Sequence, residues 1–335
     1  MKRWLALLLL VLTAGLSVGC NGTDPEGFDI YVTVYPIEYL VDSLLQGTEI
    51  TCGVVPGVSS HQESIDWSPK QIIAMTNAKY LFFVGANLDI YIDNQVNGVF
   101  SGKPVTLVKL ETALPDLLIP GTVDHDHEEP TEPLAEEEEN HLLGWDPHFW
   151  ISPLRMIQLV DLLEAKLSDS ANGYPDLADE ISANKITLLA KLNELNTQYD
   201  LVLDRVDAHA VMTSTNLYGY LEHDYGLKNY PVSPGYHEEA DQFTTQQKEL
   251  AVQQALEHEI RYIIYEKNAS SPLSNAVFDA LSQTSPEWDP LKLEFNIMHS
   301  FAMSDRVDGE GNVRDYYTVM LENLQVLRTA TGYTE

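Results

Sequence analysis

Short apolar runs alternate along the chain with segments in which apolar residues recur every three or four positions. Runs rich in β-branched residues predict strands at 30–34, 50–55, 80–84 and 105–110, and helical spacing predicts helices between them at 36–45 and 69–77. Because these strands are apolar along nearly their whole length, both faces of their sheet should be covered. The pattern therefore predicts a parallel sheet with helices on both faces.

The same pattern returns in the second half of the chain. Helices are expected at 244–258 and 316–327, and strands at 210–214, 261–265 and 291–298. The predicted fold class is therefore α/β, with two Rossmann-like lobes that each contain a parallel sheet. The N-terminal lobe is expected over 28–174 and the C-terminal lobe over 207–335.

One long linking helix is predicted between the lobes, over 175–206. Its apolar residues, from Leu177 to Val202, recur at steps of three, four and seven, which keeps them on one face. Pro175 stands in the first turn, where proline is tolerated. At about 1.5 Å per residue, a helix of about 30 residues would span about 45 Å, enough to run along both lobes. A partner-binding coiled coil is the alternative, although the apolar stripe is short for one.

The chain begins like a secreted protein. Lys2 and Arg3 precede an apolar run over 4–18. That run has about 15 residues, whereas a helix needs about 20 to span a bilayer, so a signal peptide over 1–20 fits better than a transmembrane anchor.

The chain has two cysteines, Cys20 and Cys52. Residues 16–20 resemble a bacterial lipobox, with serine where leucine is usual, so Cys20 is the expected site of lipidation, and 21–27 is the expected tether. The alternative for Cys20 is an ordinary residue near a cleavage site. Cys52 lies in an apolar run and is expected to be a buried core residue. With Cys20 lipidated, an intramolecular disulfide and a thiolate metal cluster are excluded, so a metal site would need His, Asp and Glu.

The composition is acidic: 51 Asp and Glu stand against 19 Lys and Arg, a formal net charge of −32. Nucleic acid is excluded as a partner, because neutralising phosphates requires a basic surface. An acidic surface suits a soluble protein outside the cytoplasm or one that attracts cations. Segment 122–141 has no Lys or Arg and contains His125, His127 and His141, so we expect an acidic loop. The loop either collects cations weakly near a binding cleft or is a solvated insertion without a specific role.

Two histidines stand in loops suited to a binding site. His61 follows a turn-rich stretch after a predicted strand, and ligands of parallel α/β sheets bind beyond the carboxyl ends of strands. His148 lies in the proline- and tryptophan-rich stretch 145–153, where Asp146 is close enough to orient its imidazole. The alternatives are a polar surface residue for His61 and, for His148, the polar tip of a packed aromatic loop.

The stretch 146–153, DPHFWISP, resembles the Asp-Pro-His-x-Trp motif of the zinc/manganese-binding lipoproteins of ABC importers. The resemblance extends over most of the mature chain, including 32–37, the acidic loop and 315–324. It implies two lobes joined by one long rigid helix, with the metal in the cleft between them. It also implies a lipid-anchored, extracytoplasmic protein that captures a divalent metal and delivers it to an ABC permease, and we expect a monomer.

The resemblance also implies the metal ligands. His61 and His148 fall on the first two ligand positions, and His299 replaces the Asp often found at the fourth. The third position, His or Glu in the family, falls on Thr215, whose neutral hydroxyl is a poor ligand for zinc. His237 is a candidate for the missing donor, with a surface loop residue as its alternative. Three imidazoles with water or a carboxylate favour Zn²⁺, and Mn²⁺ comes second because its sites favour more oxygen donors.

Two other functions compete with transport. A secreted zinc hydrolase would need a general base such as Glu266 or Glu238 beside the metal. The sequence contains neither a His-Glu-x-x-His motif nor a Gly-x-Ser-x-Gly motif, so we predict that the protein is not an enzyme. The other alternative, suggested by Thr215, is a metal-binding adhesin or sensor that no longer serves transport.

Overall fold

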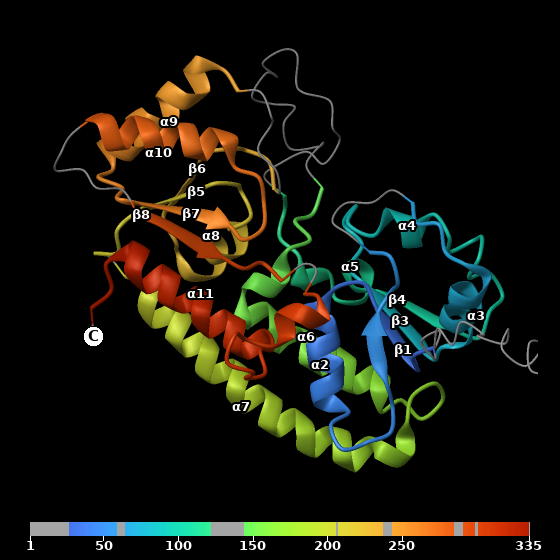
Figure 1. Ribbon diagram of the computed structural model, residues 1–335. Helices are drawn as coiled ribbons and strands as arrows, with labels where there is room; N and C mark the ends of the chain where they lie inside the picture. Colours follow the sequence, from blue (N-terminus) through green and yellow to red (C-terminus); the bar gives the residue numbers. More distant parts are fainter. Residues whose placement is uncertain are drawn as a thin grey trace, which may run out of the picture.

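The computed structural model describes residues 27–58, 64–121, 144–205, 207–236, 243–284, 291–298 and 301–334. These residues form two lobes, each built on a parallel four-stranded sheet, and they confirm the predicted α/β class (Figure 1). The N-terminal sheet has the order β2-β1-β3-β4, with strands Cys52–Val54, Ile30–Val32, Tyr80–Phe83 and Thr106–Lys109. The C-terminal sheet has the order β6-β5-β7-β8, with strands Asn229–Pro231, Val211–Thr213, Tyr262–Glu266 and Leu291–Phe295.

Helices flank both sheets. Figure 1 shows α9 and α10 on one side of the C-terminal sheet and α11 on the other. The helices of the N-terminal lobe are α2 (Tyr35–Leu44), α3 (Pro69–Asn77), α4 (Ile90–Asp93) and α5 (Leu110–Ala113). Those of the C-terminal lobe are α8 (Gly219–Tyr225), α9 (Thr245–Glu257), α10 (Pro272–Thr284) and α11 (Tyr316–Thr331). Short 3₁₀ helices are η1 (Pro115–Leu117), η3 (Phe149–Ile151), η4 (Pro175–Leu177) and η5 (Met303–Arg306), and α6 is Pro153–Leu167.

The long helix α7, Ala178–Leu203, runs beneath both lobes (Figure 1). It follows the 3₁₀ turn η4, which carries Pro175 in its first turn, where proline is tolerated. Its apolar stripe is buried against α2, α6 and α11, and the hydroxyl of Tyr199 donates to the carbonyl of Met320 at 2.9 Å. The stripe therefore belongs to the core of this chain rather than to a coiled coil with a partner.

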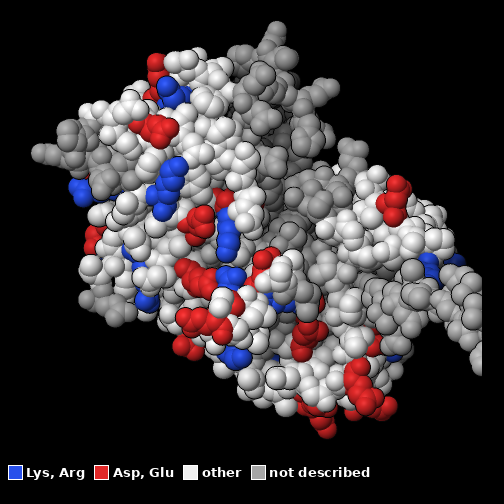
Figure 2. Space-filling view, viewed as in Figure 1, with Lys and Arg blue, Asp and Glu red and all other residues white. Residues whose placement is uncertain are grey.

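One continuous core joins the lobes through α6 and α7, and smaller clusters cover the outer face of each sheet. Cys52 is a buried member of the main core, as predicted, and burial raises the pKa of its thiol. Among the described residues no helix is long and apolar enough to cross a membrane. Figure 2 shows that basic side chains accompany the acidic ones around α7 and α11, so the net charge forms no uniform acidic patch on that face.

Candidate metal site

Asp146 and His148 form a buried pair in the loop that leads into α6. Nδ1 of His148 lies 2.7 Å from Oδ1 of Asp146, and the same oxygen accepts the backbone N–H of His148 at 2.9 Å. The side chains are 0% and 2% exposed. With the Nδ1 proton directed at the carboxylate, the lone pair of the imidazole is on Nε2, which is the form in which histidine binds a metal.

Hydrogen bonds from the C-terminal lobe hold this loop in place. The hydroxyl of Tyr220 donates to the carbonyl of Asp146 at 2.6 Å, and the indole of Trp150 donates to the carbonyl of Ile297 at 2.6 Å. The hydroxyl of Tyr316 donates to the carbonyl of Trp150 at 2.7 Å. Since Trp150 and Tyr316 are both 0% exposed, buried hydrogen bonds tie the loop that carries His148 to the C-terminal lobe.

Thr215 lies in the loop after β5 of the C-terminal lobe. Its side chain is 0% exposed, and its Oγ1 has no hydrogen-bond partner within the described parts of the chain. The backbone N–H of Asn216 donates to the carbonyl of Gly235 at 2.8 Å, and the ring of Tyr236 packs 5.1 Å from that of His148. The loop after β5 is thereby connected to His148 through Gly235 and Tyr236.

Asp89 connects the carboxyl ends of two strands in the N-terminal sheet. Its Oδ2 accepts hydrogen bonds from the hydroxyl of Thr33, which follows β1, and from the N–H groups of Val84 and Gly85, which follow β3, at 2.6 to 3.2 Å. Burial raises the pKa of Asp89 to about 6, against the effect of these hydrogen bonds. Since the strands are parallel, their carboxyl ends share one edge, the usual place for a ligand in such sheets.

A strained residue precedes the predicted donor His299. Met298 has φ of 54° and is 1% exposed. For a residue other than glycine, this backbone conformation costs about 1–3 kcal/mol of free energy, and strain of this kind is common at functional sites.

The described residues contain part of the predicted ligand set. Asp146, His148 and Thr215 lie within them, and only Asp146 and His148 are in direct contact. His61, His237, His299 and Cys20 lie outside them, as do Glu238 and the acidic loop 122–141. Within the described ranges, no three His, Cys, Asp or Glu side chains converge as a metal cluster would. Glu266, the other candidate base, ends β7 and is buried.

The sequence did not single out the residues that support the pair. Tyr220 and Tyr236 contact Asp146 and His148 from the C-terminal lobe, 74 and 88 positions along the chain, and no local pattern indicates such contacts. A signal did exist for α6: Ser152 and Pro153 match an N-cap followed by a first-turn proline, and the side chain of Ser152 accepts from the N–H of Arg155.

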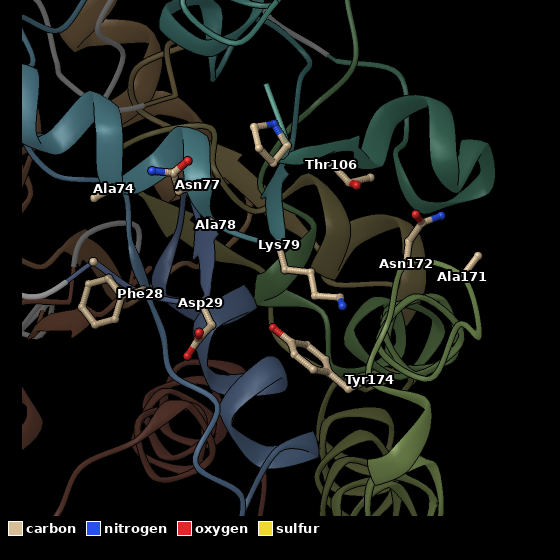
Figure 3. A pocket seen from close by; sticks show the side chains of 12 residues that line it. Phe28, Asp29, Ala74, Asn77, Ala78, Lys79, Thr106, Ala171, Asn172 and Tyr174 are labelled. Carbon is tan, nitrogen blue, oxygen red and sulfur yellow. The ribbon is translucent and has the colours of Figure 1, made fainter. Parts of the chain in front are cut away.

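A separate hollow lies at the opposite edge of the N-terminal sheet. It is lined by residues near the amino ends of β1, β3 and β4, among them Asp29, Lys79 and Thr106, and by Tyr174 (Figure 3). The Lys79 ammonium lies 4.7 Å from the centre of the Tyr174 ring, and Asp29 accepts hydrogen bonds from Thr51. Because these groups satisfy one another far from the Asp146–His148 pair, we do not assign the metal to this hollow.

Comparisons with known proteins agree on one family. The family model ZnuA, zinc-uptake complex component A, periplasmic, matches residues 30–330. The chain is 27% identical over 337 residues to the zinc-binding lipoprotein AdcA of Streptococcus pneumoniae, covering 99% of this chain and 61% of AdcA. It is 26% identical to AdcA of Streptococcus pyogenes, covering 90% and 56%. The high-affinity zinc uptake system protein ZnuA of Bacillus subtilis is 23% identical, with 98% and 97% covered.

Solved structures share the fold. The Zn(II)-bound ZnuA-like domain of Streptococcus pneumoniae AdcA has a TM-score of 0.65 at 23% identity, covering 91% of this chain and 99% of that domain. The periplasmic zinc-binding protein TroA of Treponema pallidum has a TM-score of 0.64 at 13% identity, covering 90% and 98%. The chain spans between half and two thirds of the length of the AdcA proteins that it matches.

Proposed function

The chain belongs to the ZnuA family of periplasmic zinc-uptake components, and from this premise we propose that it captures Zn²⁺ outside the cytoplasm and delivers it to an ABC permease. The observation that carries the proposal is the buried Asp146–His148 pair. A histidine that is removed from water and given a defined tautomer by a carboxylate matches the way proteins prepare imidazole for a metal. Mn²⁺ is the second candidate for the ion.

We assign His61, His148 and His299 as ligands from the two lobes. Thr215 remains a weak candidate because its hydroxyl is neutral, and His237 is the candidate that would replace it. Water or a carboxylate can complete a four-coordinate zinc site. The proposal includes a signal peptide over 1–20, a lipid on Cys20 that holds the protein at the membrane, and a monomer as the working form.

Asparagine in place of Asp146 is expected to weaken zinc binding by about 10–100-fold, the range found when a residue that orients a metal-bound histidine is changed. Asparagine keeps the size of the side chain but loses the negative charge that fixes the Nδ1 proton. Competition titration at neutral pH measures the effect, and the wild type is expected to bind one equivalent. Failure of the wild type to bind zinc, manganese or any other divalent metal would refute the transport role.

Thr215→His should strengthen zinc binding by about tenfold or more, because it adds an imidazole donor at the buried position where the family resemblance expects the third ligand. Thr215→Val, which is similar in size and has no hydroxyl, is the matched control and should leave the affinity within about twofold, since the hydroxyl is a weak donor. Equal affinities for the histidine variant and the valine variant would show that position 215 does not face the ion.

A further inference from the structure

One face of α2 contacts the segment that connects β8 to α11. The ring of Tyr35 lies 4.8 Å from that of Phe301, and the ring of Tyr39 lies 5.3 Å from that of Tyr316. All four side chains are buried. Because α2 packs in the N-terminal lobe and the other two residues follow the last strand of the C-terminal lobe, this face is a contact between the lobes (Figure 1).

An ion pair also joins α2 to the segment that follows β8. Nη1 of Arg306 donates to Oε1 of Glu38 at 3.0 Å, and Nη2 donates to Oε2 at 2.7 Å. Two parallel hydrogen bonds of this kind are the strong form of an arginine–carboxylate pair. The side chains are 23% and 8% exposed, so both charges are largely removed from water. Loss of either partner would leave the other charge buried without compensation.

Arg306 contacts α2 a second time and is also held by its own segment. Its guanidinium carbon lies 4.6 Å from the centre of the Tyr35 ring of α2, and on the C-terminal side its Nε donates to the carbonyl of Phe301 at 3.4 Å. Its carbonyl accepts the N–H of Arg314 at 2.8 Å, in the segment that leads into α11. Moving α2 away from α11 therefore requires the Glu38–Arg306 pair to break.

Because His148 is buried, the Glu38–Arg306 contact can control access to the proposed zinc site. Because His148 is 0% exposed, an ion can reach or leave its Nε2 only when a covering element moves, and in two-lobed proteins such movement is a displacement of one lobe against the other. From these contacts we infer that Glu38 and Arg306 form an inter-lobe lock, a pair of positioning residues that sets how fast the zinc site opens. The inference rests on the proposed function.

Zinc release tests the lock. Zinc-loaded protein is mixed with an excess of a chromogenic chelator, and Glu38→Gln, Arg306→Gln and the double variant are compared with wild type. Each single variant should release zinc about tenfold faster or more, because weakening a buried charge pair acts mainly on dissociation. The double variant should be no faster than the faster single variant, since both changes remove one contact.

Glu322→Gln is the matched control. This change removes the carboxylate that pairs with Arg314, and that ion pair lies wholly in the C-terminal lobe. The rate of zinc release should stay within about twofold of wild type, because an exposed ion pair contributes little. Where the wild type binds zinc, equal release rates in Glu38→Gln and Glu322→Gln would overturn the lock.

Hydrogen exchange of the metal-free protein separates the lock from the proposed function. Amides of α2 and of residues 301–306 should exchange faster in Glu38→Gln and Arg306→Gln, but not in Glu322→Gln. If the wild type bound no zinc, the proposed function would fail, and this comparison would still decide the lock. Faster exchange in the two pair variants would support it, and unchanged exchange would overturn it.

Discussion

Replacing His148 by alanine is expected to weaken zinc binding more than about 100-fold. This loss of affinity is larger than the loss of about 10–100-fold expected when a residue that only orients a ligand is replaced. The change removes the imidazole that we propose as a ligand, and it leaves the Asp146 carboxylate buried without its partner. Replacing His61, His148 and His299 together should abolish measurable binding at micromolar protein.

Competition against a chelator at neutral pH measures the zinc affinity of the single and the triple variant. His258→Ala is the control, because His258 is exposed and stacks on Tyr230 at the end of α9, where no ligand is proposed. Its affinity should equal that of the wild type. A triple variant that binds zinc as tightly as the wild type would refute the ligand assignment while leaving the fold unaffected.

The second large effect concerns stability: Asp224→Ala is expected to lower the free energy of unfolding by about 3–5 kcal/mol, as for breaking a buried ion pair. Arg155 of α6 donates to Asp224 of α8 through Nε at 2.8 Å and through Nη2 at 2.6 Å. The hydroxyl of Ser152 donates to the same carboxylate at 2.6 Å. The Asp224 side chain is 2% exposed, so its removal leaves a largely buried guanidinium without its counter-charge.

The pH dependence of this pair has a defined sign. Burial alone would raise the pKa of Asp224, but the hydrogen bonds from Arg155 and Ser152 outweigh it and hold the pKa below the ordinary value of 3.8. The stabilisation is therefore fully present above about pH 4 and is lost as the pH falls through the lowered pKa.

Urea denaturation of the wild type and of Asp224→Ala at pH 7 and at pH 3 measures both the loss and its pH dependence. The difference in the free energy of unfolding between the two proteins should be smaller at pH 3 than at pH 7. Asp207→Ala is the matched control, because Asp207 pairs with Arg205 at the surface and its side chain is 78% exposed. A loss for Asp224→Ala no larger than that for Asp207→Ala would show that the pair contributes little.

Much of the architecture follows from the spacing of apolar residues. Runs such as 80–84 have no polar face, so they were expected to be buried strands. The apolar residues of α7 stay on one side of the helix for about seven turns, so that side was expected to pack against the rest of the protein. Several elements were not predicted, among them α6, α8, α10 and β6. β6 is a short edge strand of half-exposed residues that ends in Pro231, and proline removes a donor from the ladder, so its sequence reads as a loop.

The candidate site was predictable only where it is local. Asp146 and His148 are two residues apart in a stiff motif, so their contact could be expected from the sequence. Other contacts join residues far apart in the sequence: Tyr236 and His148 are 88 positions apart, and Arg306 and Glu38 are 268 positions apart. Such contacts depend on how the lobes pack against α7. Thr215 was recognised only through a family resemblance, since a threonine after a strand carries no chemical signal of its own.

A structure of the protein loaded with zinc, with the ion identified by anomalous scattering at the zinc edge, tests the central claim most directly. We predict one zinc ion about 2.0–2.1 Å from Nε2 of His148, with further donors from both lobes and Asp146 still bound to Nδ1. Zinc bound elsewhere, with His148 outside its coordination sphere, would contradict the account.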